Sequence, residues 1–357
     1  MKRIAMLLGL VAGAAEIAVG QCSWSPLGTG MAMAVGDPSP ATAATMAVFD
    51  DGNGPALYVG GVFTAAGGVT VSKVAKWNGS SWSDVGGGME YNSLVLKLAV
   101  YNGALYAAGT FNTAGGQSAS RIAKWDGQAW SPLGVGLNGQ ANALAVFDDG
   151  SGRPALFVGG TFTTAGGITV NRIAKWDGVS WSALTTGLSS FANVITTYNG
   201  ALYVGGNFTS AGGVPATRIA KWDGTTWSAV GTGATGAVND FAAFDAGGGT
   251  ALYAGGSFGI IKWDGATWTT VPGGPGASAL LAFNGALYTT GGFVTVGTTC
   301  ANNIAKWDGT TWSPLASGLY SNGNAMAVFN GDLHVSGQFL SASGVAGTTR
   351  IARWSCP

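Results

Sequence analysis

Charged side chains are scarce in this sequence. Only 9% of the 357 residues are Asp, Glu, Lys or Arg, and the 16 acidic residues balance the 16 basic ones, so the formal net charge is zero. Binding to nucleic acid or to an anionic membrane surface depends on clustered positive charge, which a neutral and charge-poor chain does not supply. We therefore expect no nucleic-acid partner.

Histidine and cysteine are nearly absent, with one and three copies respectively. Metal centres and acid–base sites are usually built from clusters of such residues with carboxylates. His334 falls on an expected strand where other repeats have Tyr or Phe, so we interpret it as structural. The Asp-Asp-Gly-x-Gly segments at Asp50 and Asp148 have too few oxygen ligands for a calcium loop and are interpreted as ordinary turns. The sequence predicts no metal site and no cofactor.

Long hydrophobic runs are missing after the first twenty residues. At the start, Met1-Lys2-Arg3 precedes a short apolar run over residues 4–15, which is typical of a secretion signal. Cleavage after Gly20 would leave residues 21–357 as one domain, whereas the alternative is a buried N-terminal strand or helix. We expect a monomer without a membrane span that is secreted, or periplasmic, in an oxidising compartment.

Glycine and tryptophan, in contrast, are abundant, with 62 and 14 copies. The tryptophans fall into two sets of seven: one lies in a Lys-Trp-Asp/Asn-Gly unit or a close variant, and the other follows five residues later, except for one member left at the start of the chain. The first set is Trp77, Trp125, Trp176, Trp222, Trp263, Trp307 and Trp354, and the second is Trp24, Trp82, Trp130, Trp181, Trp227, Trp268 and Trp312. The first set has a spacing of about 41 to 51 residues, which is typical of propeller blades.

Each repeat contains four short apolar segments, which we name strands a to d with a innermost. In the third repeat they cover residues 143–147, 155–158, 172–176 and 181–184. Strands a and b are separated in four repeats by Asn-Gly, a hairpin signal, at Asn102-Gly103, Asn199-Gly200, Asn284-Gly285 and Asn330-Gly331. The sequence predicts an all-β, seven-bladed β-propeller with four antiparallel strands per blade.

The end of strand b carries a further signature. In most repeats it is a glycine pair: Gly60-Gly61, Gly159-Gly160, Gly205-Gly206, Gly255-Gly256 and Gly291-Gly292. With the following Trp-Asp turn, this pattern resembles the kelch repeat of galactose-oxidase-type propellers. The fuller pattern Leu-Tyr-Val-Gly-Gly-x-Phe-Thr, Arg-Ile-Ala-Lys-Trp-Asp-Gly and Trp-Ser-Pro-Leu-Gly is similar to repeats of fungal bud-site cortical marker proteins. The resemblance implies a cell-surface or cortical role, but not the copper chemistry of galactose oxidase, which needs two histidines.

The two ends of the chain supply parts of one blade. The chain opens with a d strand at Trp24 and closes with a c strand at Trp354, so the last blade combines both ends. Cys22 and Cys356 then stand where the other repeats have the c–d turn, which predicts a disulfide in place of the missing peptide connection. Cys300 has no obvious partner, and we expect it to be buried.

Most charges recur at fixed positions of the repeat. Aspartates fall in the a–b and c–d turns, where they are expected to form turns. Basic residues gather on the c strands, as with Arg172 and Lys175, and are expected to pair with turn aspartates or to cover tryptophan rings. The acids that remain, on the face formed by the b–c and d–a loops, are Asp37, Glu90 and Asp240.

That face is the expected binding face, and its longest loop covers residues 28–43. Recurrent asparagines at the start of strand a form either a ring of amides around the channel mouth or caps of their own turns. The candidate ligand-binding residues are Glu90, Tyr91, Asn142, Phe191, Asn193, Asn239, Asp240, Tyr320, Asn322 and Asn324. We predict a non-enzymatic binding propeller that recognises a protein or a glycan. The alternatives are a secreted polysaccharide hydrolase or lyase using Glu90 or Asp240, and a purely structural exoprotein.

Overall fold

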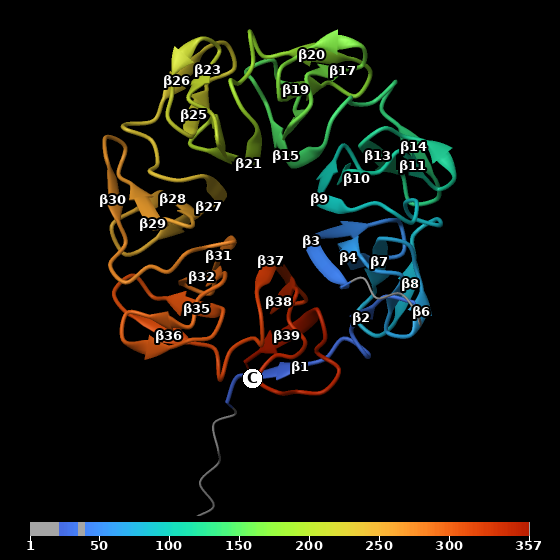
Figure 1. Cartoon of the computed structure of the whole chain (residues 1–357), viewed down its shortest axis with the longest axis vertical. Coiled ribbons are helices and arrows are strands. Elements are labelled where there is room, and N and C mark those ends of the chain that lie inside the picture. The colour runs from blue at the N-terminus through green and yellow to red at the C-terminus, as the bar shows by residue number, and fades with distance from the viewer. Residues whose placement is uncertain (1–20, 35–39, 357) are drawn as a thin grey trace, which may run out of the picture.

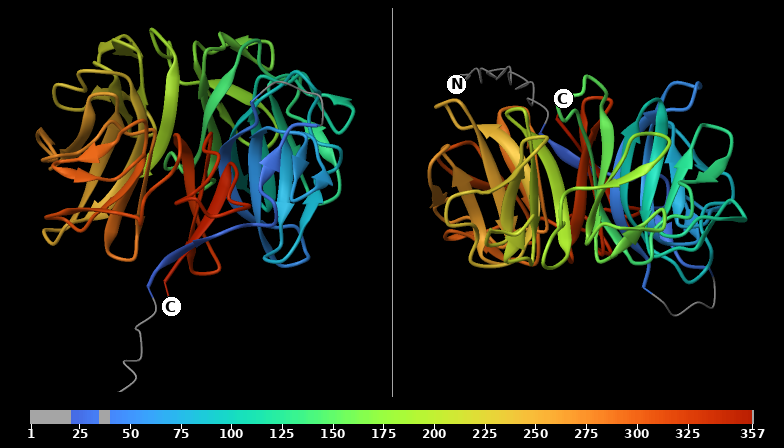
Figure 2. Two further views of the ribbon diagram at one scale, coloured as in Figure 1. Left: turned by 60° about the horizontal axis from the view of Figure 1, so that its bottom comes forward. Right: turned by 90° about the horizontal axis from the view of Figure 1, so that it is seen from above.

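The computed structural model describes residues 21–34 and 40–356, to which all structural statements below refer. The predicted signal peptide, and Asp37 in the 28–43 loop, lie outside these residues. Seven four-stranded antiparallel sheets surround a central axis, and strand a is the innermost strand of each sheet (Figure 1). Seen from the side, the sheets form a disc (Figure 2). The predicted β-propeller is confirmed.

The strands of each blade follow one another from the centre outward. Blades 1 to 3 consist of β3 (Thr42–Asp50), β4 (Pro55–Val62), β7 (Val74–Trp77) and β8 (Trp82–Asp84); β9 (Val95–Tyr101), β10 (Ala104–Gly109), β13 (Ile122–Trp125) and β14 (Trp130–Pro132); and β15 (Ala141–Phe147), β16 (Ala155–Gly160), β19 (Ile173–Trp176) and β20 (Trp181–Ala183). Blades 4 and 5 consist of β21 (Ala192–Tyr198), β22 (Ala201–Gly206), β25 (Ile219–Trp222) and β26 (Trp227–Ala229); and β27 (Val238–Asp245), β28 (Thr250–Gly256), β29 (Gly259–Trp263) and β30 (Trp268–Thr270). Blade 6 consists of β31 (Ala279–Phe283), β32 (Ala286–Thr290), β35 (Ile304–Trp307) and β36 (Trp312–Pro314). In the described residues, no helix is long and apolar enough to cross a membrane.

Blade 7 is closed by both ends of the chain, as predicted. It consists of β37 (Gly323–Phe329), β38 (Asp332–Gly337), β39 (Ile351–Ser355) and the N-terminal β1 (Ser23–Ser25). Trp24 pairs with Trp354 across the two outer strands. Cys22 and Cys356 form a disulfide with a Cα–Cα distance of 4.1 Å, so a covalent link stands where the other blades have their c–d turn.

The Asn-Gly turns between strands a and b have the predicted hairpin geometry. Asn102 and Gly103 have φ angles of 47° and 69°, and the three other pairs are similar. Two successive left-handed residues are typical of a type I′ turn, which matches the twist of the flanking strands. The short a–b turns are therefore a direct consequence of local sequence.

The b–c connections hold small hairpins that the four-strand repeat did not predict. They are β5 (Ala65–Ala66) with β6 (Val69–Thr70), β11 (Thr113–Ala114) with β12 (Gln117–Ser118), β17 (Thr164–Ala165) with β18 (Ile168–Thr169), β23 (Ser210–Ala211) with β24 (Val214–Pro215), and β33 (Thr295–Val296) with β34 (Thr299–Cys300). The linker from the preceding blade pairs with several of these hairpins, through β2 (Met31–Ala32) in blade 1 and through single bridges such as Leu137 to Ala165. Neighbouring blades are thus joined at this face by backbone hydrogen bonds.

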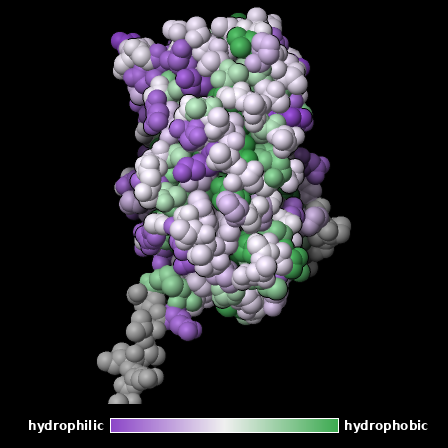
Figure 3. Space-filling view, turned by 90° about the vertical axis from the view of Figure 1, so that its left-hand side faces the viewer, coloured by the Kyte–Doolittle hydropathy of each residue, from purple (hydrophilic) through white to green (hydrophobic). Residues whose placement is uncertain are grey.

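A second connection joins the blades at the rim. The outer-strand tryptophan of each blade donates a hydrogen bond from its indole Nε1 to a backbone carbonyl just after the outer strand of the preceding blade. The seven pairs are Trp24 to Leu315, Trp82 to Leu27, Trp130 to Val85, Trp181 to Leu133, Trp227 to Leu184, Trp268 to Val230 and Trp312 to Pro272. The side of the molecule that carries β30 shows hydrophilic, intermediate and hydrophobic residues interspersed (Figure 3).

The glycine pairs at the end of strand b are confirmed in blades 1, 3, 4 and 5, but the pair predicted in blade 6 is shifted by one residue. Gly291 there occupies the second position of the pair, because a Cβ on it would lie 2.2 Å from the Gly276 carbonyl oxygen, just as a Cβ on Gly61 would lie 2.0 Å from that of Thr42. The first position is taken by Thr290, not by a glycine. Only the second position faces a backbone atom of its own blade, and it alone is glycine throughout.

Candidate binding face

The candidate asparagines lie on bulges of the innermost strands. The strand register shifts around Asn142, Asn193, Asn239 and Asn324. Three of these asparagines donate a side-chain hydrogen bond of 3.0–3.1 Å to a backbone carbonyl beyond their own blade. The pairs are Asn142 to Ala192, Asn193 to Val238 and Asn239 to Ala277. The amides of Asn142, Asn193 and Asn239 therefore link adjacent blades and do not cap their own turns.

All four asparagines line the central channel, where the innermost strands enclose a cavity of about 160 Å³. Asp240 and Lys97 line the same cavity. Asp240 accepts hydrogen bonds from the backbone amides of Phe241 (2.9 Å) and Leu280 (2.8 Å), so its carboxylate joins blades 5 and 6. Burial raises the pKa of Asp240 above its usual value, although Lys97 acts in the opposite direction. Of the two candidate acids that the structure describes, the one in the channel therefore has the raised pKa.

Glu90 lies away from the channel and holds the b–c hairpin of blade 2. Its carboxylate accepts hydrogen bonds from the backbone amide of Asn112 and from the amide (2.6 Å) and hydroxyl (2.9 Å) of Thr113. Partial burial acts to raise the pKa of Glu90, but these hydrogen bonds outweigh it and leave the pKa below its usual value. The Asn138 side chain accepts equivalent bonds from the amides of Thr163 and Thr164 in blade 3. The glutamate therefore performs a structural role that recurs in the repeat.

Tyr91 is an exposed candidate on the loop face. Its side chain is 59% exposed, and the ammonium of the buried Lys73 lies 5.0 Å from the centre of its ring. Beside it lies a hollow of about 300 Å³ whose apolar walls are Met33, Val62 and Leu94. These residues come from the b–c and d–a loops of blades 1 and 2, on the predicted binding face.

The three other candidates are separated from this hollow. Tyr320 is 57% exposed, beside the b–c connection of blade 7, where its backbone amide bonds to Ser341. Phe191 and Asn322 occupy equivalent positions before strands β21 and β37, and their carbonyls accept hydrogen bonds from Asn207 and Gln338. The structure therefore groups Asp240 with the four asparagines in the channel and leaves Tyr91, Phe191 and Tyr320 on three separate d–a linkers.

The basic residues before the c strands have a role that the sequence did not predict. Arg172 and Arg218 have φ angles of 70° and 63°, and each guanidinium donates to the carbonyl of a d–a linker, at Leu188 and Ala234. Asn303 does the same with its amide to Leu319. The recurrence of a long hydrogen-bond donor at this position was the available signal. The second basic residue of the repeat does pair with turn aspartates in part, as in Lys76 with Asp51 at 2.5 Å.

Cys300 and His334 are the two remaining side chains that could take part in chemistry. The expected burial of Cys300 is wrong: it lies on β34, the outward-facing strand of a small surface hairpin, and is exposed. His334 is buried, packs edge-on against Phe329 at 5.8 Å, and burial lowers its pKa to about 4. Across residues 21–34 and 40–356, no three His, Cys, Asp or Glu side chains are grouped as a metal site. In the first Asp-Asp-Gly-x-Gly loop, Asp50 caps the amides of Gly52 and Gly54, as expected of a turn.

Comparison with known proteins gives structural neighbours only. No protein-family model and no curated protein matches the chain. A chain of a mitotic checkpoint complex matches at 15% identity and a TM-score of 0.57 over 99% of both chains. YCF48 from Cyanidioschyzon merolae matches at 13% identity and a TM-score of 0.55, over 93% of this chain and 98% of that one. The fold is that of a β-propeller. The computationally designed Ika8 protein is also similar, at 13% identity and a TM-score of 0.53, over 88% of this chain and 96% of that one. At such identities the likeness concerns the fold alone.

Proposed function

We propose that this chain is a secreted, non-enzymatic binding propeller of the kelch-like type, which recognises its partner through the face of b–c and d–a loops. The partner is a protein or a glycan, and the mature chain of residues 21–357 is a monomer. The observation that carries the proposal is the exposed Tyr91 beside a partly apolar hollow of about 300 Å³. Exposed aromatic rings at the edge of a pocket are typical anchors of binding surfaces.

The surroundings of Tyr91 favour a protein partner over a glycan. Met33, Val62 and Leu94 offer apolar contact in this hollow, and Asn92 adds one amide. The hydroxyls of Ser93 and Thr110 also line it, but they already bond to the Glu90 carbonyl and the Leu94 amide. The ammonium of the buried Lys73 lies 5.0 Å from the ring centre, and this cation–π contact holds the ring in place. Secretion is favoured by the Cys22–Cys356 disulfide, since such bonds persist in oxidising compartments.

The two candidate acids favour binding over catalysis. Glu90 is held by three hydrogen bonds and has a lowered pKa, which disfavours the protonated form that a general acid needs. Asp240 has a raised pKa, but both its oxygens accept backbone amides at a channel cavity of about 160 Å³. A glycoside hydrolase would usually need a second carboxyl group facing the same substrate.

The test is an array of extracellular proteins and glycans probed with the purified protein. Tyr91→Ala should weaken a genuine hit by about tenfold or more, because it removes the aromatic anchor, while Tyr91→Phe should retain it. The matched control is Val179→Ala, since Val179 is 86% exposed on a c–d turn of the other face. Hits that are unchanged in Tyr91→Ala and in Tyr320→Ala would contradict this binding face. Polysaccharide turnover that is lost in Glu90→Gln would establish an enzyme instead.

A further inference from the structure

The opposite face, formed by the a–b and c–d turns, has a cavity of about 450 Å³ between blades 4 and 5. Its aromatic lining residues are Tyr198 and Tyr203 from blade 4 and Trp263 from blade 5. One lysine from each blade, Lys221 of β25 and Lys262 of β29, also lines it. This volume is within the range of small-molecule sites and exceeds that of the hollow beside Tyr91.

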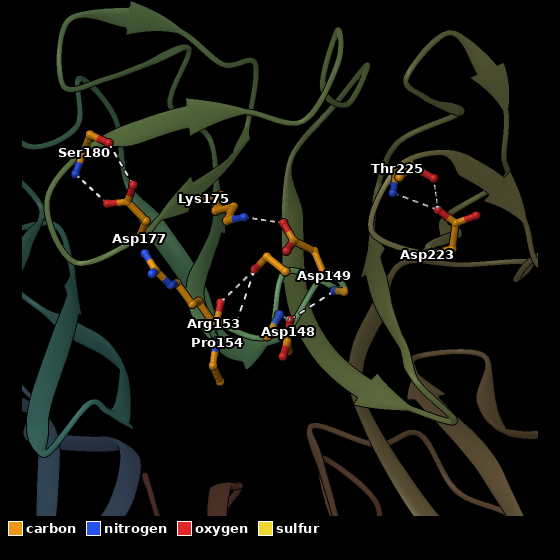
Figure 4. A network of polar contacts seen from close by, with 12 residues as sticks. Asp148, Asp149, Arg153, Pro154, Lys175, Asp177, Ser180, Asp223 and Thr225 are labelled. Atoms are coloured by element: carbon orange, nitrogen blue, oxygen red, sulfur yellow. Dashed lines mark hydrogen bonds and ion pairs between the residues drawn. The ribbon is translucent and has the colours of Figure 1, made fainter.

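Other blades show what such lysines do when an acid is available. In blade 1, Lys76 pairs at 2.5 Å with Asp51, the second aspartate of the a–b turn. In blade 3, Lys175 pairs with Asp149 in the same way (Figure 4). Both ammonium groups are thereby neutralised within their own blade, so these lysines are unavailable for an external anion.

Blades 4 and 5 lack this second aspartate. The a–b turn of blade 4 is only Asn199-Gly200, and in blade 5 Ala246 follows Asp245, whose carboxylate caps the amides of Gly247 and Gly249. In the part of the chain that the structure describes, the side-chain ammonium of neither Lys221 nor Lys262 has an ion pair or a hydrogen bond. Two lysines without an acid therefore face one cavity.

The acid nearest in the lining does not replace the missing partner. Asp264 accepts hydrogen bonds from the amides of Ala266 (2.8 Å) and Thr267 (2.7 Å) and from the Thr267 hydroxyl, all within its own turn. These bonds lower the pKa of Asp264, so it remains a turn-forming carboxylate. With the two lysines, the lining carries an excess of one positive charge.

The cavity is open because no turn covers it. The long a–b turns of blades 1 and 3 reach the c–d turn of the next blade, where a Cβ on Gly127 or Gly224 would lie 3.0 Å or 2.4 Å from a backbone oxygen of the turn. At the junction of blades 4 and 5, a Cβ on Gly265 would have nothing within 4 Å. The short Asn-Gly turn thus removes both the acid and the cover.

We propose that this cavity binds an acidic saccharide, with a uronic-acid carboxylate accepting hydrogen bonds from Lys221 and Lys262. The aromatic lining supplies flat apolar surface for the C–H face of a pyranose ring, and the lysines supply charge-assisted hydrogen bonds. The combination selects an anionic sugar over a neutral sugar, which leaves the charge unmatched, and over a bare anion, which leaves the aromatic walls unused. The site is separate from the loop face around Tyr91.

The test is calorimetric titration of the full mature protein with an oligogalacturonide, beside a neutral galactose oligomer of the same length. We expect binding of the acidic oligomer alone, weakened by salt, and weakened about tenfold or more in Lys221→Met and in Lys262→Met. Ala246→Asp should also weaken it, by giving Lys262 the partner that Lys76 has in Asp51. Lys124→Met is the matched control, because Lys124 has the same place in the repeat but does not line the cavity.

Three outcomes would overturn the proposal: equal binding of the neutral oligomer, equal competition by an acidic peptide, or unchanged affinity in the Lys221→Met/Lys262→Met double variant. Thermal unfolding of each variant shows whether lost binding reflects lost folding. Tyr91→Ala should leave this titration unchanged, so that failure of the loop-face proposal and failure of this one are distinguishable.

Discussion

The indole Nε1 of Trp24 donates a 3.3 Å hydrogen bond to the carbonyl of Leu315, 291 positions away in the sequence. The same bond joins Trp82 to Leu27 at 2.8 Å, between blades connected by a continuous chain. The junction that closes the ring therefore repeats the contact of the other junctions. Since Trp24 belongs to a strand without a peptide link to its own blade, this bond and the disulfide together hold β1 in place.

The rim hydrogen bonds should contribute measurably to stability. In Trp82→Phe the carbonyl of Leu27 loses its partner inside the protein, which should lower the free energy of unfolding by about 1–3 kcal/mol beyond the loss of ring volume. Trp77→Phe is the control: Trp77 packs against Trp82 in a tilted arrangement with ring centroids 5.2 Å apart, but its indole makes no hydrogen bond within the described residues. Urea unfolding measures both. Equal losses would mean that ring packing, and not the hydrogen bond, joins the blades.

The Cys22–Cys356 disulfide should be a large single contribution to stability. It joins residues 334 positions apart, and without it β1 can leave blade 7. In the chain-entropy description, a loop of this length corresponds to about 6 kcal/mol as an upper value, with lower values where the unfolded chain retains structure. Cys22→Ser should show this loss in urea unfolding, while Cys300→Ser, at an exposed free thiol, should leave stability within about 0.5 kcal/mol. A stability unchanged by reducing agent would show that the pairing of β1 with β39 and the Trp24 hydrogen bond suffice to close the ring.

The buried His334 should make the protein sensitive to mild acid. Burial lowers its pKa to about 4, against 6.5 in the unfolded chain, so between these values the unfolded state binds the extra proton. Stability should therefore fall as pH decreases from 6.5 to 4, by about 3 kcal/mol, and this loss should be absent above pH 6.5. His334→Tyr, which installs the residue that other blades have, should remove this loss when thermal unfolding is measured across that range.

Asp51 provides an internal control for that experiment. Burial acts to raise the pKa of Asp51, but hydrogen bonds from Lys76 and Tyr58 outweigh burial and lower this pKa to about 2. Its contribution is fully present above its unfolded pKa of 3.8 and is lost only below that value. Asp51→Asn should therefore alter stability above pH 4 without changing the slope between pH 4 and 6.5. A slope that persists in His334→Tyr would have to come from another group.

The residues that sequence reasoning placed correctly are those whose role is decided within one repeat. Trp77 and its counterparts gave the blade period, Asn102-Gly103 requires a particular turn, and Cys22 with Cys356 completes an interrupted hairpin. The roles of Asn142, Glu90 and Arg172 were missed because each bonds a carbonyl or an amide in a neighbouring linker, hairpin or blade. Which backbone atom faces a side chain across such a junction depends on blade spacing, which no local pattern determines. The cavity at Lys221 and Lys262 became visible for the same reason only once blades 4 and 5 were side by side.

The second glycine of the b-strand pair should be the least replaceable residue of the repeat. A Cβ on Gly61 would lie 2.0 Å from the carbonyl oxygen of Thr42, a backbone atom of the paired strand that cannot rotate away. Gly61→Ala should therefore cost about 1–3 kcal/mol of stability, as overpacking in a rigid site does. Gly248→Ala is the control, since a Cβ there meets nothing within 4 Å and its φ is not left-handed. The measurement is the urea midpoint of unfolding of each variant, which we expect to fall in Gly61→Ala and to stay unchanged in Gly248→Ala. If Gly61→Ala matched Gly248→Ala, strands β3 and β4 would have to separate at little cost, and the presence of glycine at this position in every blade would need a reason other than close backbone approach.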